Sequence, residues 1–113
     1  MPRRTEAKPL CLKVGNRVRE LRQERGMSLQ DLASAGAMSK GQLASIEQGL
    51  AAITIETIER IALALGVPSL CIITFPADDE LNHIVELARK LPKGERRKLR
   101  KELEALTTHE PPT

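Results

Sequence analysis

Two short amphipathic segments separated by a tight turn constrain the fold of this chain more than any other feature. The first begins at Ser28, a residue type that caps helix N-termini well, and ends near Gly36. The second begins a few residues later at Ser39, another good N-cap, and ends at Gly49. Two short helices joined by a tight glycine-containing turn are what a helix-turn-helix motif requires.

Helical periodicity continues on both sides of this pair. The apolar spacing predicts one helix from Val14 to Gly26 and another from Thr54 to Gly66. Residues 70–75 suit a strand by their β-branched content and a short buried helix by their position after Pro68. We favour the helix, because no partner strand is visible elsewhere in the sequence.

Residues 77–113 carry two further amphipathic patterns, interrupted at Pro92 and Gly94. The sequence therefore predicts an all-α fold, in which a five-helix domain over residues 14–76 is followed by two C-terminal amphipathic helices. The last residues, from Thr107 onwards, are predicted to be frayed.

Composition excludes several functional classes. The 113 residues include one Phe and neither Trp nor Tyr, so the core must be aliphatic, and binding of nucleic acid by stacking on aromatic rings is excluded. No run of about 18 apolar residues and no secretory signal is present, so we expect no membrane span and a cytoplasmic location. Cys11 and Cys71 lie far apart, and we interpret them as small hydrophobic residues rather than a redox pair.

The positive charge is concentrated at the N-terminal end. Residues 1–26 hold eight Lys or Arg and three Glu, although the whole chain has a net charge of only +3. Residues 1–13 contain two prolines and no helical period, and we predict a basic arm there. Such an arm suits a polyanion such as DNA; the alternative is a solvated leader.

The helix that begins at Ser39 has the chemistry to contact DNA bases. Lys40 can donate to guanine, Gln42 can pair with adenine through two hydrogen bonds, and Ser45 can donate or accept. The helix N-termini at Ser28 and Ser39 present backbone N–H groups that suit phosphates. The complete set of candidate DNA contacts is Ser28, Ser39, Lys40, Gly41, Gln42, Ser45, Gln48 and Arg17.

Residues 14–68 resemble the XRE family of helix-turn-helix proteins, which includes the lambda-type phage repressors and Cro. The resemblance is carried by Val18-Arg19-Glu20-Leu21-Arg22, Gly26-Met27-Ser28, Leu32-Ala33, Ser39, Ile46-Glu47-Gln48-Gly49 and Ile61-Ala62-Leu63-Ala64-Leu65-Gly66-Val67.

The resemblance implies a five-helix DNA-binding domain that acts as a dimer on a two-fold symmetric operator. It also implies a buried ion pair between Arg22 and Glu47 that holds the third helix against the first. The sequence departs from the family pattern at Leu29, where a phosphate-contacting Gln is frequent, and at Gly41, which has no side chain to offer a base. We therefore expect DNA shape and the basic arm to contribute more than usual to binding.

The two C-terminal helices lie outside the resemblance, and neither can bury its apolar stripe alone. We favour dimerisation with a second copy of the chain over packing on the first domain. The basic run at residues 96–101 is interpreted as a solvated face rather than a second DNA contact. The candidate dimerisation residues are Leu81, Ile84, Leu91, Leu99 and Leu103.

We accordingly expect a transcriptional regulator that binds double-stranded DNA as a homodimer, represses, and needs no cofactor. The alternative is an antitoxin-type interaction protein whose C-terminal helices bind and mask a partner protein. An enzyme is not expected, because the sequence has no nucleophile–base grouping and no glycine-rich phosphate loop. Asp79 and His83 share one helix face, but an acidic residue at a helix start is normally a complement to the helix dipole.

Overall fold

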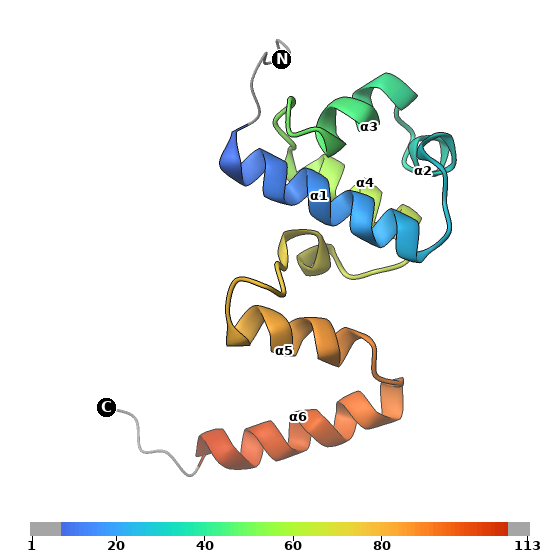
Figure 1. Ribbon diagram of the computed structural model, residues 1–113. Helices are drawn as coiled ribbons and strands as arrows, with labels where there is room; N and C mark the ends of the chain where they lie inside the picture. Colours follow the sequence, from blue (N-terminus) through green and yellow to red (C-terminus); the bar gives the residue numbers. More distant parts are fainter. Residues whose placement is uncertain (1–7, 109–113) are drawn as a thin grey trace. The chain divides into compact units, whose positions relative to one another are not determined.

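The computed structural model describes residues 8–108, and within that range the chain forms helices and no strand. The all-α class predicted from the sequence is therefore confirmed. In chain order (Figure 1), the elements are α1 (Pro9–Glu24), α2 (Leu29–Ala35), α3 (Lys40–Glu47), α4 (Ile55–Leu65), the 3-10 helix η1 (Ser69–Ile73), α5 (Glu80–Arg89) and α6 (Lys93–Thr108).

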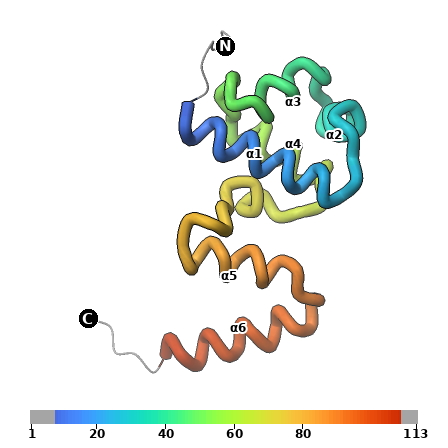
Figure 2. The backbone as a smooth tube through the Cα atoms, viewed as in Figure 1, coloured from blue at the N-terminus to red at the C-terminus, as the bar shows by residue number. Residues whose placement is uncertain are grey.

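The chain divides into two compact units between Phe75 and Pro76. The first unit contains α1 to α4 and η1, and the second contains α5 and α6. The backbone trace in Figure 2 shows α2 and α3 joined by a tight turn within the first unit, next to α1.

The start of α1 corrects the prediction of an arm over residues 1–13. The helix begins at Pro9, and Lys8 before it is extended, with φ −79° and ψ 144°. Proline breaks a helix interior but suits the first helical position, where its fixed φ is helical and no N–H is needed. Residues 9–13 therefore belong to the first domain, and residues 1–7 of the predicted arm lie outside the described residues.

Three side-chain caps set the starts of α2, α3 and α4 as predicted. The hydroxyl oxygens of Ser28, Ser39 and Thr54 accept hydrogen bonds of 3.0, 3.0 and 3.1 Å from the backbone N–H three residues later. At Ser28 the box is reciprocal, because the Asp31 carboxylate accepts from the Ser28 N–H at 3.0 Å. These caps fix the direction in which each short helix leaves its turn.

The core of the first unit is aliphatic, as the composition requires. Its buried members come from all four α-helices and from η1: Val14, Val18, Leu21, Leu32, Ala33, Leu43, Ile46, Ile61, Ala62, Leu65 and Ile72. Gly15 allows α1 to approach α3 closely, since a Cβ there would lie 2.6 Å from the carbonyl oxygen of Glu47 and would also overlap the carbonyl of Ile46.

Residues 69–73 form a short helix, as we favoured over a strand, but it is a 3-10 helix and it is buried only in part, because Leu70 and Ile73 are exposed. Cys71 and Ile72 are buried, and the Thr74 hydroxyl donates to the Leu70 carbonyl oxygen at 2.7 Å. Short 3-10 helices are common in such connections.

The second unit differs from the first because none of its described apolar side chains is buried. Asp79 caps α5 by accepting from the Asn82 N–H at 2.8 Å. The predicted interruption at Gly94 is absent, since α6 begins at Lys93 and includes Gly94. The helix also extends through Thr108, so the tail predicted to be frayed is helical over its first two residues, and residues 109–113 lie outside the described range.

Across residues 8–108, no helix combines the length and the apolar character that crossing a bilayer demands.

Candidate nucleic-acid interface

The turn between α2 and α3 has the hydrogen bonding of a Schellman motif. The Met38 N–H donates to the Ala33 carbonyl oxygen at 2.9 Å, and the Ala37 N–H donates to the Ser34 carbonyl oxygen at 3.2 Å. The left-handed residue of the motif is Ala37, with φ 54°, and not Gly36, which has φ −90°. Because Ala has a Cβ, this left-handed conformation is strained. The strain lies in the turn that sets the direction of α3.

Both ends of α3 carry exposed residues, and most of them are polar. Lys40, Gly41 and Gln42 at its start and Gln48 at its end are exposed, and a Cβ at Gly41 would meet no atom within 4 Å. The Ser39 hydroxyl oxygen caps the helix, so its hydrogen stays available for donation to a phosphate oxygen. The exposed residues thus offer hydrogen-bond donors and acceptors on a narrow rod that fits a major groove.

The opposite side of α3 is buried and includes one residue that we predicted to contact bases. Leu43 and Ile46 pack into the core. Ser45 is only 8% exposed, so it offers a base little surface, and its assignment as a base contact is not supported. The sequence already indicated that Ser45 is buried, because it lies two positions after Leu43 and one position before Ile46, and both of these residues face inward.

Arg22 and Glu47 form the ion pair that the resemblance implied. Arg22 Nε donates to Glu47 Oε2 at 2.8 Å, and Arg22 Nη2 donates to Glu47 Oε1 at 2.9 Å. Arg22 also donates to the Met27 carbonyl oxygen at 3.0 Å. The hydrogen bond to Glu47 raises the pKa of Arg22, against the opposing effect of burial. The pair therefore ties the end of α3 to α1 with two parallel charge-assisted bonds.

Arg17, another predicted DNA contact, is a structural residue, and that prediction is wrong. Its side chain is buried, with Nε donating to the Cys71 carbonyl oxygen at 2.8 Å and Nη1 donating to Glu20 Oε1 at 2.6 Å. The bond to Cys71 joins α1 to η1, and the bond to Glu20 lies within α1. Arg17 lies next to Val18 and one helical turn from Leu21, so its place beside the apolar stripe was visible in the sequence.

The N-terminus of α2 is exposed, as a phosphate contact at Ser28 requires. The capping box occupies the Ser28 hydroxyl oxygen as an acceptor and leaves its hydrogen for donation. The two hydrogen bonds from Ser28, backbone first, lower the pKa of Asp31. Leu29, where the family has a frequent Gln, instead packs partly against the core.

Sequence reasoning missed Arg60, an exposed residue of α4. Its guanidinium donates to the Ala37 carbonyl oxygen at 3.4 Å and to the Thr57 hydroxyl at 3.3 Å. It therefore places a positive charge beside the turn that joins α2 to α3. No local pattern indicated this position, because the contact spans 23 residues of sequence.

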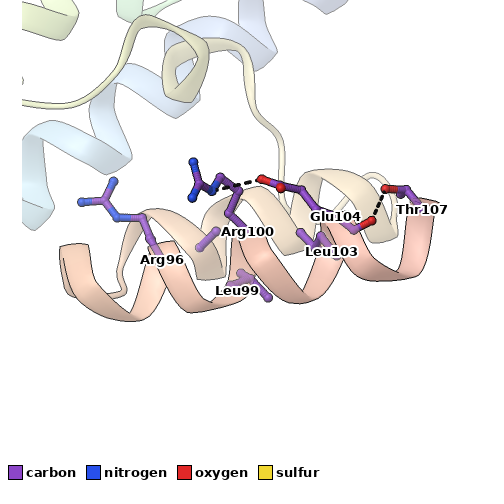
Figure 3. Close-up of a pocket in the computed structure, with 7 residues that line it drawn as sticks. Arg96, Leu99, Arg100, Leu103, Glu104 and Thr107 are labelled. Carbon is purple, nitrogen blue, oxygen red and sulfur yellow. Dashed lines mark hydrogen bonds and ion pairs between the residues drawn. The ribbon is translucent and has the colours of Figure 1, made fainter. Parts of the chain in front are cut away.

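The residues predicted for dimerisation lie in the second unit and are largely exposed. Leu81 is 70% exposed, and Ile84 and Leu103 are also exposed, whereas Leu91 and Leu99 are half-buried. Leu99 and Leu103 line a hollow of about 370 Å³ between α5 and α6, shown in Figure 3, together with Ala88 of α5 and Arg96, Arg100, Glu104 and Thr107 of α6. Among the described residues, no group of three or more His, Cys, Asp or Glu is placed to hold a metal ion.

Comparisons with known proteins match the first unit. The helix-turn-helix family model matches residues 18–70. The HTH-type transcriptional regulator DdrOP3 of Deinococcus deserti is 39% identical over 56 residues, which cover 50% of this chain and 43% of DdrOP3. The HTH-type transcriptional regulator SutR of Escherichia coli is 43% identical over 51 residues, which cover 45% of this chain and 29% of SutR. The chain thus spans less than half the length of either relative.

A match to a solved structure supports the same family. The crystal structure of SinR, described as the master regulator for biofilm formation, in complex with DNA is 31% identical, with a TM-score of 0.51. The match covers 53% of this chain and 97% of that one. Together with the capped α2–α3 pair and the Arg22–Glu47 bond, these matches show that the chain belongs, through residues 18–70, to the XRE-type helix-turn-helix family.

Proposed function

We propose that the protein is a transcriptional regulator that binds double-stranded DNA by placing α3 in the major groove. The main support for the proposal is the contrast between the buried and the exposed residues of α3. Leu43, Ile46 and Glu47 fasten it to the first unit, while Lys40 and Gln42 are exposed at its N-terminal end. Residues near the start of a recognition helix are the ones that reach base edges.

The proposed base contacts are few. The Lys40 ammonium would donate to guanine O6 or N7, and the Gln42 amide would pair with the N6 and N7 edge of adenine. Gly41 would let the backbone approach the duplex closely without reading a base. With so little direct readout, we expect sequence-dependent groove shape to supply part of the specificity.

Phosphate contacts would hold α3 in register. The exposed N-termini of α2 at Ser28 and of α3 at Ser39 would each offer backbone N–H groups of the first helical turn and a serine hydroxyl hydrogen. Such groups suit a phosphate oxygen. Arg60, beside the connecting turn, would add a positive charge to the same contact.

We further propose that the protein acts as a homodimer through α5 and α6 on a palindromic operator. Support comes from the exposed apolar side chains Leu81, Leu87 and Leu106, which a second copy could cover. Two copies related by a two-fold axis would read half-sites about 34 Å apart, one helical turn of DNA. A dimer bound to both half-sites would cover that face of the duplex and would repress transcription by occlusion.

Selection of bound duplexes from a random pool, followed by light scattering of the free protein, tests the proposal. The expected result is an inverted-repeat consensus and a dimeric mass, with truncation after Pro76 giving a monomer. Recovery of unenriched sequences would refute specific DNA binding. A monomeric full chain that forms a stable complex with a second small protein would favour the antitoxin-type alternative, in which α5 and α6 mask that partner.

A further inference from the structure

The strongest charge feature outside the helix-turn-helix lies at the start of α6. The nine residues from Lys93 to Lys101 hold six cationic side chains and one carboxylate, Glu95. Four of the cations, Lys93, Arg96, Arg97 and Arg100, follow the spacing i, i+3, i+4, i+7. That spacing puts them on one face of the helix. They line a surface hollow of about 300 Å³, and no other described residue contributes to it.

Neutralisation of this face within the described chain is incomplete. Arg100 pairs with Glu104 at 3.1 Å, as Figure 3 shows, and Lys98, on another face of α6, pairs with Glu95 at 3.4 Å. Lys93, Arg96 and Arg97 form no ion pair with any residue from 8 to 108. The basic face, defined as Lys93, Arg96, Arg97 and Arg100, therefore keeps most of its charge.

The position of the basic face on the helix adds an energetic argument. The N-terminal end of an α-helix carries a partial positive charge, and cations in its first turns are unfavourable. α6 places Lys93 and Arg96 there, on the same face as Arg97, while Glu95, the acidic residue of that first turn, pairs with Lys98. An external anion would relieve both the mutual repulsion and the unfavourable interaction with the helix dipole.

We propose that the basic face of α6, which the sequence alone favoured as a solvated face, is a second DNA-binding surface that contacts the phosphate backbone. The inference rests on the proposed function, because it extends DNA binding from the first unit to the second. Three guanidinium groups on one face offer the paired N–H donors that match phosphate oxygens. DNA is favoured over a lipid surface because the first unit of the same chain belongs to a helix-turn-helix family, and a lipid surface is one of the outcomes that the test distinguishes.

The salt dependence of DNA binding by the full chain tests this inference. The probe is a duplex of mixed sequence, long enough to span two half-sites, titrated by fluorescence anisotropy at several salt concentrations. Each phosphate contact contributes about 0.9 to the slope of log K against log salt. The double variant Arg96→Gln/Arg97→Gln should therefore reduce the slope by up to about 1.8 and weaken binding severalfold at low salt.

Lys98→Gln is the matched control, because Lys98 is adjacent in sequence but lies on another face and is paired with Glu95. It should leave the slope nearly unchanged. Gln is a good helix former, so all these variants should keep the circular dichroism of the parent chain. An unchanged slope in the double variant would refute the inference, as would a control that shifts the slope half as far, since net charge alone would then explain both.

The same variants distinguish the other outcomes. Parent protein that binds no duplex would refute the proposed function and this inference together. Parent protein that binds DNA through α3 while the double variant keeps its slope would refute this inference alone. If the double variant loses binding only to vesicles that contain phosphatidylserine, the basic face is a membrane contact and the assignment to DNA is wrong.

Discussion

Arg22 of α1 and Glu47 of α3 are joined by two hydrogen bonds of 2.8 and 2.9 Å, although they are 25 residues apart in sequence. The Glu47 side chain is 3% exposed and that of Arg22 is 14% exposed, so water screens the pair only weakly. Since α3 is only eight residues long, one such bond at its C-terminal end determines much of its orientation.

Breaking this pair should destabilise the fold. Glu47→Gln removes the carboxylate and leaves Arg22 partly buried without its counter-charge, so we expect a loss of about 2–3 kcal/mol in the free energy of unfolding. Arg19→Gln is the control: Arg19 also approaches Glu47, at 3.4 Å, but its side chain is 45% exposed, and the expected loss is under about 1 kcal/mol. Urea denaturation measures both values, and equal losses would show that the pair is no more than a surface contact.

Two helical glycines should respond in opposite ways to alanine. Gly15→Ala places a Cβ against the α3 backbone at Ile46 and Glu47, so we expect a loss of about 1–3 kcal/mol or more as the helices move apart. Gly41→Ala meets open space within α3 and should stabilise the protein by about 0.5–1 kcal/mol. Thermal unfolding of the two variants tests the packing of α1 on α3, which a neutral Gly15→Ala would contradict.

Relief of strain at Ala37 should stabilise the α2–α3 turn. Ala37 has a positive φ of 54°, and glycine adopts that conformation without a Cβ penalty. We expect Ala37→Gly to raise the free energy of unfolding by about 1 kcal/mol. Ala35→Gly, two residues earlier and within α2, should instead lower it by about 0.5–1 kcal/mol. Chemical denaturation of both variants gives the signs, and a destabilised Ala37→Gly would show that the turn is not strained.

The local part of the fold could be read from the sequence because its determinants are local. Ser28, Ser39 and Thr54 cap helices through bonds to residues three positions away, and the apolar stripes follow helical spacing. The start of α1 at Pro9 was not predicted, because proline breaks the interior of a helix but is also common as the first helical residue, which is its position here.

Contacts between distant segments were harder to predict. The bond from Arg17 to the Cys71 carbonyl oxygen spans 54 residues, and no local pattern indicates its acceptor. The Arg22–Glu47 pair became predictable only through the resemblance to a known family. The basic face of α6 was visible as charge in the sequence, but the sequence did not show that only Arg100 of its four cations pairs with a carboxylate among the described residues.

Sequence-specific DNA binding by this protein depends most directly on base readout by α3. After selection of a preferred duplex, the affinities of the parent protein, Lys40→Ala and Gln42→Ala are to be measured for that duplex and for every single-base variant of it. We predict that each substitution reduces discrimination by about 1–3 kcal/mol at one defined base pair per half-site and leaves discrimination at the others unchanged. Uniform weakening on all duplexes, with no position at which discrimination is lost, would contradict the placement of α3 in the major groove.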